Sequence, residues 1–210
     1  MSGVESRLSE LRPFGLPSPL TSSGAAAATA MPDTSAASDL RYPIGRADRR
    51  PGLTPGDRRA AIDALAVAPE ALRAAVRGLT DEQLDTEYRP GGWTVRQLVH
   101  HLADSHMNAY IRFKLGFTEE NPTIKPYDQD AWVALEDSAL PPAVSLDLLS
   151  ALHTRLVSLL RATPGDAFAR TLQHPENGPM TLDSMLGIYS WHGRHHTAHI
   201  TSLRERMGWS

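Results

Sequence analysis

Apolar residues recur at every third or fourth position in four long segments of this 210-residue chain. This repeat places apolar side chains on one face of an α-helix, so each segment predicts a helix with one buried stripe. The segments begin near residues 55, 94, 145 and 181. The alternation that is typical of half-buried strands never extends beyond a few residues. The pattern predicts an all-α protein, built as a bundle of four antiparallel helices with long connections.

Capping residues mark where these helices begin. Thr54 precedes Pro55, a typical N-cap followed by proline at the first helical position. Thr94 and Thr181 occupy the same place before the second and fourth helices. Pro69 should kink the first helix or divide it into two. In the third helix we expect the inward-facing leucines to be Leu148, Leu149, Leu152, Leu156, Leu159 and Leu160.

Composition excludes several classes of protein. A formal net charge of −3 gives no basic surface for nucleic acid or an anionic membrane. No apolar run approaches the roughly 20 residues of a membrane span, and the start of the chain lacks a secretion signal. The absence of cysteine rules out disulfides and thiolate ligands. We expect a cytoplasmic protein that binds neither nucleic acid nor membrane.

The chain divides into a tail and one domain. Residues 1–40 are rich in Ala, Ser and Pro without a periodic apolar face, so we predict a disordered tail. Residues 41–210 are long enough for one domain. Met31 lies shortly before the first domain-like sequence, so we hypothesise that residues 1–30 come from a misassigned start.

Histidines are the strongest chemical signal. Four of the nine lie within eight residues, as the pairs His192/His196 and His195/His199. Residues four apart share a helix face, so either pair could hold a divalent metal ion. His192 and His196 fall near the middle of the apolar stripe, where an imidazole needs a metal ion or a hydrogen-bond partner. The alternative is that these rings bond carbonyls or each other.

The second helix offers a third ligand. A helical projection places His101 at the edge of the apolar stripe and His106 on it, and points His100 towards solvent. His101 and His106 therefore both remain candidates. Asp104, one turn after His101, could hold the second N–H of a ligand imidazole. Three protein ligands with one open position form the pattern of catalytic zinc sites, which activate water or ionise a thiol.

Other polar residues are weaker candidates. Arg112 and Asn108 project to the side of the second helix that carries His101, and Arg112 would suit a substrate carboxylate or phosphate. The alternative is a solvated arginine on the flank of a helix. We expect His153 to be a packing or surface residue and His174 to lie in a turn.

Long motifs give the chain a resemblance to a known family. Residues 91–108 read GGWTVRQLVHHLADSHMN, and residues 191–201 read WHGRHHTAHIT. Together with Tyr110–Leu115 and the YPIG sequence at Tyr42, they resemble the YfiT branch of the DinB-like superfamily. The resemblance covers about residues 40–210. It implies an up-down four-helix bundle that is often a homodimer.

The same resemblance implies a metal site and two chemistries. Its ligands correspond to His101, His192 and His196, which leaves His106 beside the site, and the divalent ion is usually zinc or nickel. Family members are commonly described as metal-dependent hydrolases, and close relatives are similar to bacillithiol-dependent S-transferases. The first chemistry activates water, and the second binds a low-molecular-weight thiol. A metal-binding module without catalysis is the alternative from another class.

Overall fold

The computed structural model describes residues 39–210, which belong to one compact unit. Most of the predicted tail, Met31 included, lies outside the described residues. The elements in chain order are α1 (Pro55–Val76), α2 (Asp81–Leu84), α3 (Val95–Thr118), α4 (Gln129–Val133), η1 (Glu136–Ala139), α5 (Pro142–Ala162), η2 (Gly165–Ala169), β1 (Thr171–His174), β2 (Gly178–Thr181) and α6 (Leu182–Met207).

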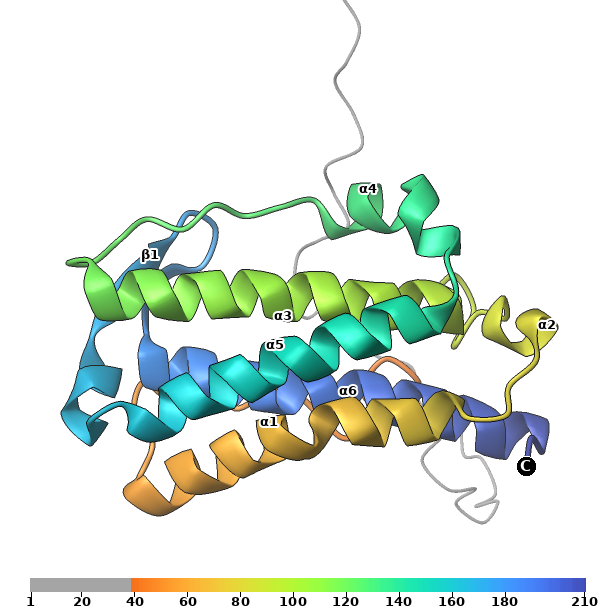
Figure 1. The fold of residues 1–210 in the computed structure, drawn as a ribbon, viewed down its shortest axis with the longest axis horizontal. Coiled ribbons are helices and arrows are strands. Elements are labelled where there is room, and N and C mark those ends of the chain that lie inside the picture. Colours follow the sequence, from red (N-terminus) through yellow and green to blue (C-terminus); the bar gives the residue numbers. More distant parts are fainter. Residues whose placement is uncertain (1–38) are drawn as a thin grey trace, which may run out of the picture. The chain divides into compact units, whose positions relative to one another are not determined.

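The four long helices α1, α3, α5 and α6 lie lengthwise against one another (Figure 1). The predicted all-α four-helix bundle is confirmed. Thr54, Thr94 and Thr181 are N-caps as expected, each accepting a backbone N–H three residues later. α1 continues through Pro69 as a single helix, so its division into two helices was wrong.

Hydrogen bonds between helix ends show the relative direction of α3 and α5. His100 near the start of α3 bonds Ser145 near the start of α5, at 2.7 Å. Beyond the other end of α5, Arg170 donates to the carbonyl of Gly116, near the end of α3, at 2.8 Å. α3 and α5 therefore run parallel, as their colours in Figure 1 also show.

The other pairs complete the topology. Arg58 near the start of α1 bonds Asp183 near the start of α6, and Arg204 near the end of α6 bonds the carbonyl of Ala75. α1 and α6 are therefore also parallel. An up-down order holds except between α3 and α5. The connection 119–141 allows this, because it is long enough in extended form (~3.3 Å per residue) to return along α3 (~1.5 Å per residue).

Two apolar clusters form the core, one towards each end of the bundle. The first includes Leu65, Phe113 and Leu160, and the second includes Leu72 and Leu98. On all four long helices, the buried residues between the two clusters are small or polar, apart from Pro69. Ala68, His106, His153, Gly193 and His196 are buried there. The candidate chemistry therefore lies in a polar layer across the middle of the bundle.

Three features of the fold differ from what the sequence predicted. Leu148 does not face inward but is 45% exposed. β1 and β2 form a short antiparallel hairpin that the sequence did not predict. α5 is the one described helix that is long and apolar enough to cross a membrane, with a mean hydropathy of 1.3. Because α5 packs against α1 and α3, a core helix accounts for that composition, and the absence of membrane contact remains a prediction.

Candidate metal centre

The structure brings His101, His192 and His196 together. His192 and His196 project from α6 one turn apart, and their Nε2 atoms are 3.0 Å from each other. His101 reaches them from α3, with its Nε2 3.4 Å from Nε2 of His192. One ring nitrogen from each of the three residues lies within 4.8 Å of the others. This is the trio implied by the family resemblance.

These separations suit one ion. Zinc binds histidine nitrogen at about 2.0–2.1 Å in tetrahedral geometry, which separates neighbouring ligand atoms by about 3.3 Å. The Nε2 atom of His192 lies 3.0 Å from that of His196 and 3.4 Å from that of His101, on either side of that value. Three protein ligands would leave one tetrahedral position open.

Burial keeps the three imidazoles neutral, as metal ligands must be. Burial lowers the pKa of His101 to about 4. It also holds the pKa of His192 and of His196 well below the usual value, and neighbouring histidines add to the effect. Three neutral rings that present nitrogen atoms to one another fit a divalent cation.

A second histidine group lies one turn further along α6. His195, His196 and His199 also have ring nitrogens within 4.8 Å of one another. Nε2 of His195 and Nε2 of His199 are 3.0 Å apart, a distance at which one ring donates to the other. Burial is the main reason that the pKa of His199 is lowered, and the charges of Arg89 and Arg206 lower it further, so the neighbourhood of this group is positive. A mutual hydrogen bond joins the two Nε2 atoms of this pair, although Nδ1 of His195 has no partner among the described residues, and nearby cations oppose a metal ion there.

His106 lies directly behind the first group. It is 1% exposed, and its Nε2 is 3.3 Å from Nδ1 of His192. It therefore meets the side of His192 that points away from His101 and His196. The sequence left His101 and His106 as competing ligands, and this orientation places His106 in contact with a candidate ligand instead.

Asp104 differs from the expectation. Among the described residues, its carboxylate makes no hydrogen bond to any of the three imidazoles, so it does not hold their second N–H. Burial and the charge of Asp137 raise its pKa to about 6. The cause is non-local, because η1 brings Asp137 close to this turn of α3. A carboxyl group with this pKa exchanges protons near neutral pH.

Arg112 reaches the histidine layer through Tyr189. Its Nη1 donates to the Tyr189 hydroxyl at 2.8 Å, and its Nη2 donates to the carbonyl of Lys125 at 3.2 Å. The Tyr189 ring contacts those of His106 and His192, with centroids 5.5 and 6.2 Å away. Nε of Arg112 is buried without a hydrogen-bond partner in the described part of the chain. The guanidinium thus has an unused donor close to the site.

Asn108 is less promising as a substrate-binding residue. Its side-chain amide donates to the backbone carbonyl of Asp104 one turn earlier in the same helix. That bond uses part of its donor capacity within α3 itself.

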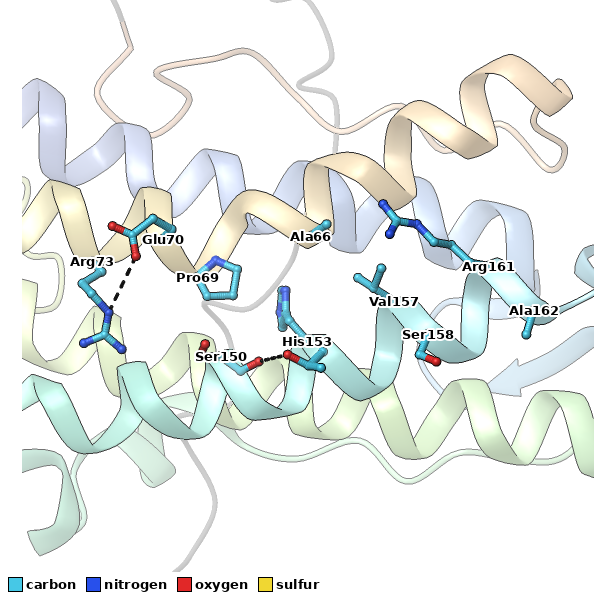
Figure 2. Close-up of a pocket in the computed structure, with 11 residues that line it drawn as sticks. Ala66, Pro69, Glu70, Arg73, Ser150, His153, Val157, Ser158, Arg161 and Ala162 are labelled. Atoms are coloured by element: carbon cyan, nitrogen blue, oxygen red, sulfur yellow. Dashed lines mark hydrogen bonds and ion pairs between the residues drawn. The ribbon is translucent and has the colours of Figure 1, made fainter.

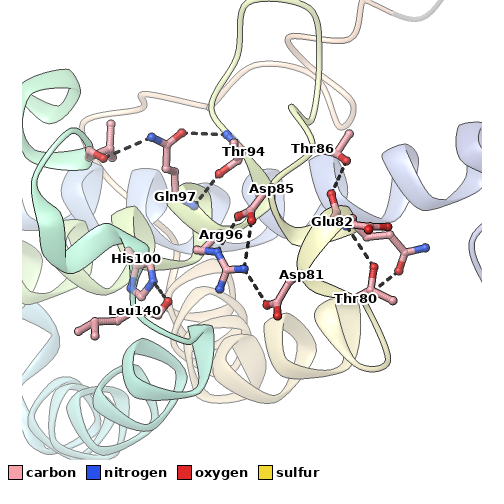
Figure 3. Close-up of polar contacts among 12 residues, drawn as sticks. Thr80, Asp81, Glu82, Asp85, Thr86, Thr94, Arg96, Gln97, His100 and Leu140 are labelled. Atoms are coloured by element: carbon pink, nitrogen blue, oxygen red, sulfur yellow. Dashed lines mark hydrogen bonds and ion pairs between the residues drawn. The ribbon is translucent and has the colours of Figure 1, made fainter.

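His100 is a correction to the helical projection. It is 6% exposed and not solvated, with Nδ1 2.7 Å from the Ser145 hydroxyl and Nε2 2.9 Å from the carbonyl of Leu140. Figure 3 shows His100 directed at Leu140, away from the capping residues Thr94 and Gln97. The segment that leads into α5 covers the face of α3 that the projection treated as free.

His153 is a packing residue, one of its two expected alternatives, and His174 lies in a strand where a turn was expected. His153 is 2% exposed, with ring nitrogens 2.8 Å from His106 and 2.6 Å from the carbonyl of Leu65. It is therefore a hydrogen-bonded member of the polar layer. His174 ends β1, and the turn follows it.

Sequence reasoning missed Tyr189 as a site residue. It lies three residues before His192 and so on the same face of α6, which was the available signal. Cavity size gives no guide to the site. A hollow of about 650 Å³ lies between α1 and α5, and another of about 790 Å³ lies beside α2 and η1. Neither is lined by His101, His192 or His196.

Comparison with known proteins identifies the family of this chain. The sequence pattern of the DinB superfamily matches residues 64–200. This chain belongs to the DinB superfamily. A protein of Bacillus cereus (strain 03BB102) is 52% identical over 171 residues, which cover 81% of this chain and 99% of that protein. A protein of Bacillus mycoides (strain KBAB4) is 53% identical over the same shares. Both carry the provisional name of metal-dependent hydrolase.

A solved structure is also similar. YfiT from Bacillus subtilis superimposes with a TM-score of 0.80 at 52% identity, over 82% of this chain and 99% of that one. It is described as a probable metal-dependent hydrolase with an unusual four-helix bundle topology. The parallel pair α3 and α5 is the feature of this chain that departs from a simple up-down bundle.

Proposed function

We propose that this chain is a metal-dependent enzyme in which His101, His192 and His196 hold one divalent ion. The observation that carries the proposal is the convergence of three imidazoles, those of the buried His101 and His196 and of the half-buried His192, with Nε2 separations of 3.0 and 3.4 Å. Zinc is our first choice and nickel the second, because an all-nitrogen site suits both. The names of the relatives support hydrolysis as the reaction class.

The residues of the site have different proposed roles. The three histidines supply ligands from two helices and leave one position open. When bound, a divalent ion there supplies Lewis-acid chemistry that favours the ionised form of a water molecule or a thiol. Arg112 provides a positive charge and one unused N–H for an anionic group of the substrate. Asp104, with a pKa of about 6, is our candidate for accepting a proton.

Water and an external thiol are both compatible with this site. The chain contains no cysteine, so a thiol nucleophile would have to come from a small molecule. The two reactions differ in one observable, which is whether turnover consumes a thiol.

Thiol dependence can be measured directly on the full chain. The zinc-loaded protein would be incubated with a reactive electrophile and bacillithiol, with glutathione, or without thiol. Metal-dependent turnover that needs no thiol supports the hydrolase, which an ester and amide panel would then define. Turnover only with a thiol would identify an S-transferase.

Removal of the ion distinguishes an enzyme from a metal-ordered module. An open catalytic site should lose activity but keep most of its helicity when a chelator removes zinc, because two apolar clusters hold the bundle. Loss of helicity together with the ion would contradict the catalytic proposal and favour a structural site.

The cytoplasmic location and the homodimer are further proposals. The cysteine-free composition supports the first, and the family resemblance supports the second. Light scattering on the purified chain would give the oligomeric state.

A further inference from the structure

Pro69 leaves a backbone carbonyl in α1 without its usual partner. In an α-helix the carbonyl of residue 65 accepts the N–H of residue 69, but proline has none. The carbonyl of Leu65 instead lies 2.6 Å from Nδ1 of His153 on α5. Figure 2 shows Pro69 and His153 facing each other across the gap between these two helices. A proline inside one helix thus creates an acceptor for a buried ring of another.

This carbonyl determines which ring nitrogen carries the proton in His153, and through it in His106 and His192. A carbonyl only accepts, so Nδ1 of His153 must carry the hydrogen, and Nε2 of the neutral ring must accept. Nδ1 of His106 lies 2.8 Å from that Nε2 and therefore donates. Nε2 of His106 is then an acceptor for Nδ1 of His192, 3.3 Å away. At the end of the series, Nε2 of His192 carries no hydrogen and faces His101 and His196.

We propose that Pro69, His153 and His106 are positioning residues that hold His192 in the tautomer whose Nε2 is free to bind a metal ion. The series Leu65 carbonyl, His153, His106 and His192 is called the histidine string below. Its tautomers follow from hydrogen bonding alone. Its role in metal binding rests on the proposed function.

Burial supports a fixed string. His106 and His153 are 1% and 2% exposed, so water does not compete for their nitrogens. The hydrogen bonds along the string use one nitrogen of His153 and of His106 as a donor and the other as an acceptor, which is the pattern of a neutral ring. An imidazole in this layer would be costly without partners, and the string supplies a partner for both nitrogens of His106 and of His153.

The string anchors a proton position and does not conduct protons. If all the tautomers reversed, the bare Nδ1 of His153 would face the Leu65 carbonyl at 2.6 Å. Two acceptors would then meet without a proton between them, in a site that excludes water. Only one direction of the string is therefore stable.

The direct test is the tautomer of each ring in the metal-free full chain. Nitrogen NMR of protein carrying ¹⁵N-labelled histidine distinguishes protonated from bare ring nitrogens. We expect the proton on Nδ1 of His153, His106 and His192. A proton on Nε2 of His192 would overturn the proposal, whatever the activity of the protein.

The second arm measures zinc affinity by calorimetry in His153→Phe. Phenylalanine fills the space but neither donates nor accepts, so His192 should populate both tautomers. Loss of such supporting hydrogen bonds typically weakens metal binding by about 10–100-fold, and we expect a loss in that range. His153→Gln, which retains a donor and an acceptor, should recover part of it. Wild-type affinity in a folded His153→Phe with an unchanged His192 tautomer would remove the string from metal binding.

The matched control is His100→Phe. His100 is equally buried on α3 and also bonds a carbonyl and a second side chain, but it is not joined to the string. Both variants should lower the melting temperature, while only His153→Phe should change zinc affinity and the His192 tautomer. If the wild type bound no zinc, the proposed function would be wrong. The NMR measurement would still show whether the histidine string has the expected tautomers. Were His153→Phe unfolded, the wild-type tautomers would decide the proposal.

Discussion

Two histidine pairs on α6 share the same spacing and nearly the same geometry, yet their surroundings differ. His192/His196 and His195/His199 are each four residues apart, and each pair has its Nε2 atoms 3.0 Å apart. The first pair meets a third imidazole from α3 and is supported from behind by His106. The second pair contacts Trp191 and Tyr88 through its rings, and the pKa of His199 is lowered mainly by burial and further by two nearby arginines. Spacing makes a metal site possible, and the neighbouring helices decide which pair becomes one.

The largest expected difference between the pairs is in metal affinity. His101→Ala should weaken zinc binding by roughly a hundredfold or more, because one of three ligands is lost. His195→Ala should retain one tightly bound ion. His196 belongs to both groups and cannot distinguish them. Calorimetric zinc titration checks both variants. If His195→Ala lost the ion and His101→Ala kept it, the metal site would belong to the second pair and not to the first.

Acid should destabilise the metal-free protein. The folded pKa of His101 is about 4, below the ordinary value of 6.5, so the unfolded chain binds more protons between these pH values. Stability is then complete above about pH 6.5 and falls as the pH drops towards 4. At pH 5 the loss from His101 alone is about 2 kcal/mol. The raised pKa of Asp104 acts in the opposite direction and offsets part of it.

Urea unfolding at pH 7.5 and pH 5 measures this loss. The pKa of His195 and of His199 is also depressed, to about 4 and about 3, so His195→Phe/His199→Phe should show a smaller pH dependence than the wild type. Equal unfolding free energies of the wild type at both pH values would mean that its histidines are not buried neutral.

The second pair should matter for stability and not for metal binding. His199→Ala leaves Nε2 of His195 buried without its partner, which costs about 1–3 kcal/mol. Zinc affinity should stay within about twofold, because a mutation outside the ligand set changes it little. Thermal unfolding and zinc titration of the same sample provide both values. A large drop in affinity with unchanged stability would contradict this assignment.

The smallest expected effect concerns the arginines near each group. Arg112→Ala should raise KM for an anionic substrate about tenfold, equivalent to about 1.4 kcal/mol, with the ion still bound. Arg206→Ala, near the second pair, is the matched control and should leave KM unchanged. Steady-state kinetics with charged and neutral substrates, once a substrate is found, separates these outcomes. Equal KM values for wild type and Arg112→Ala would exclude Arg112 from substrate binding.

Local features of the fold could be predicted from the sequence. The N-caps at Thr54, Thr94 and Thr181 and the four apolar stripes depend on neighbouring residues only, and the structure places them as expected, apart from the exposed Leu148. Helix direction could not be predicted in this way. The 3.6-residue period is the same in either direction, and α5 is parallel to α3 because the connection 119–141 returns along the length of α3.

In the candidate site, too, the features within one helix could be predicted from the sequence, and the contacts between helices could not. Projection of single helices placed His192 and His196 inward but left His101 and His106 open, and the family resemblance was needed to choose. Misplacement of His100 had a non-local cause, since a segment 40 residues away covers it. The hydrogen-bond partner of His153 could not be predicted either, because it lies in another helix. It is a carbonyl released by a proline in another helix, which no pattern within α5 reveals.

The most direct test of this account is the position of the ion in crystals of the zinc-loaded protein, located by anomalous scattering at the zinc edge. The account predicts one zinc ion bound by the Nε2 atoms of His101, His192 and His196, with Nδ1 of His192 within hydrogen-bond distance of His106. Zinc bound between His195 and His199, with the first group empty, would contradict it.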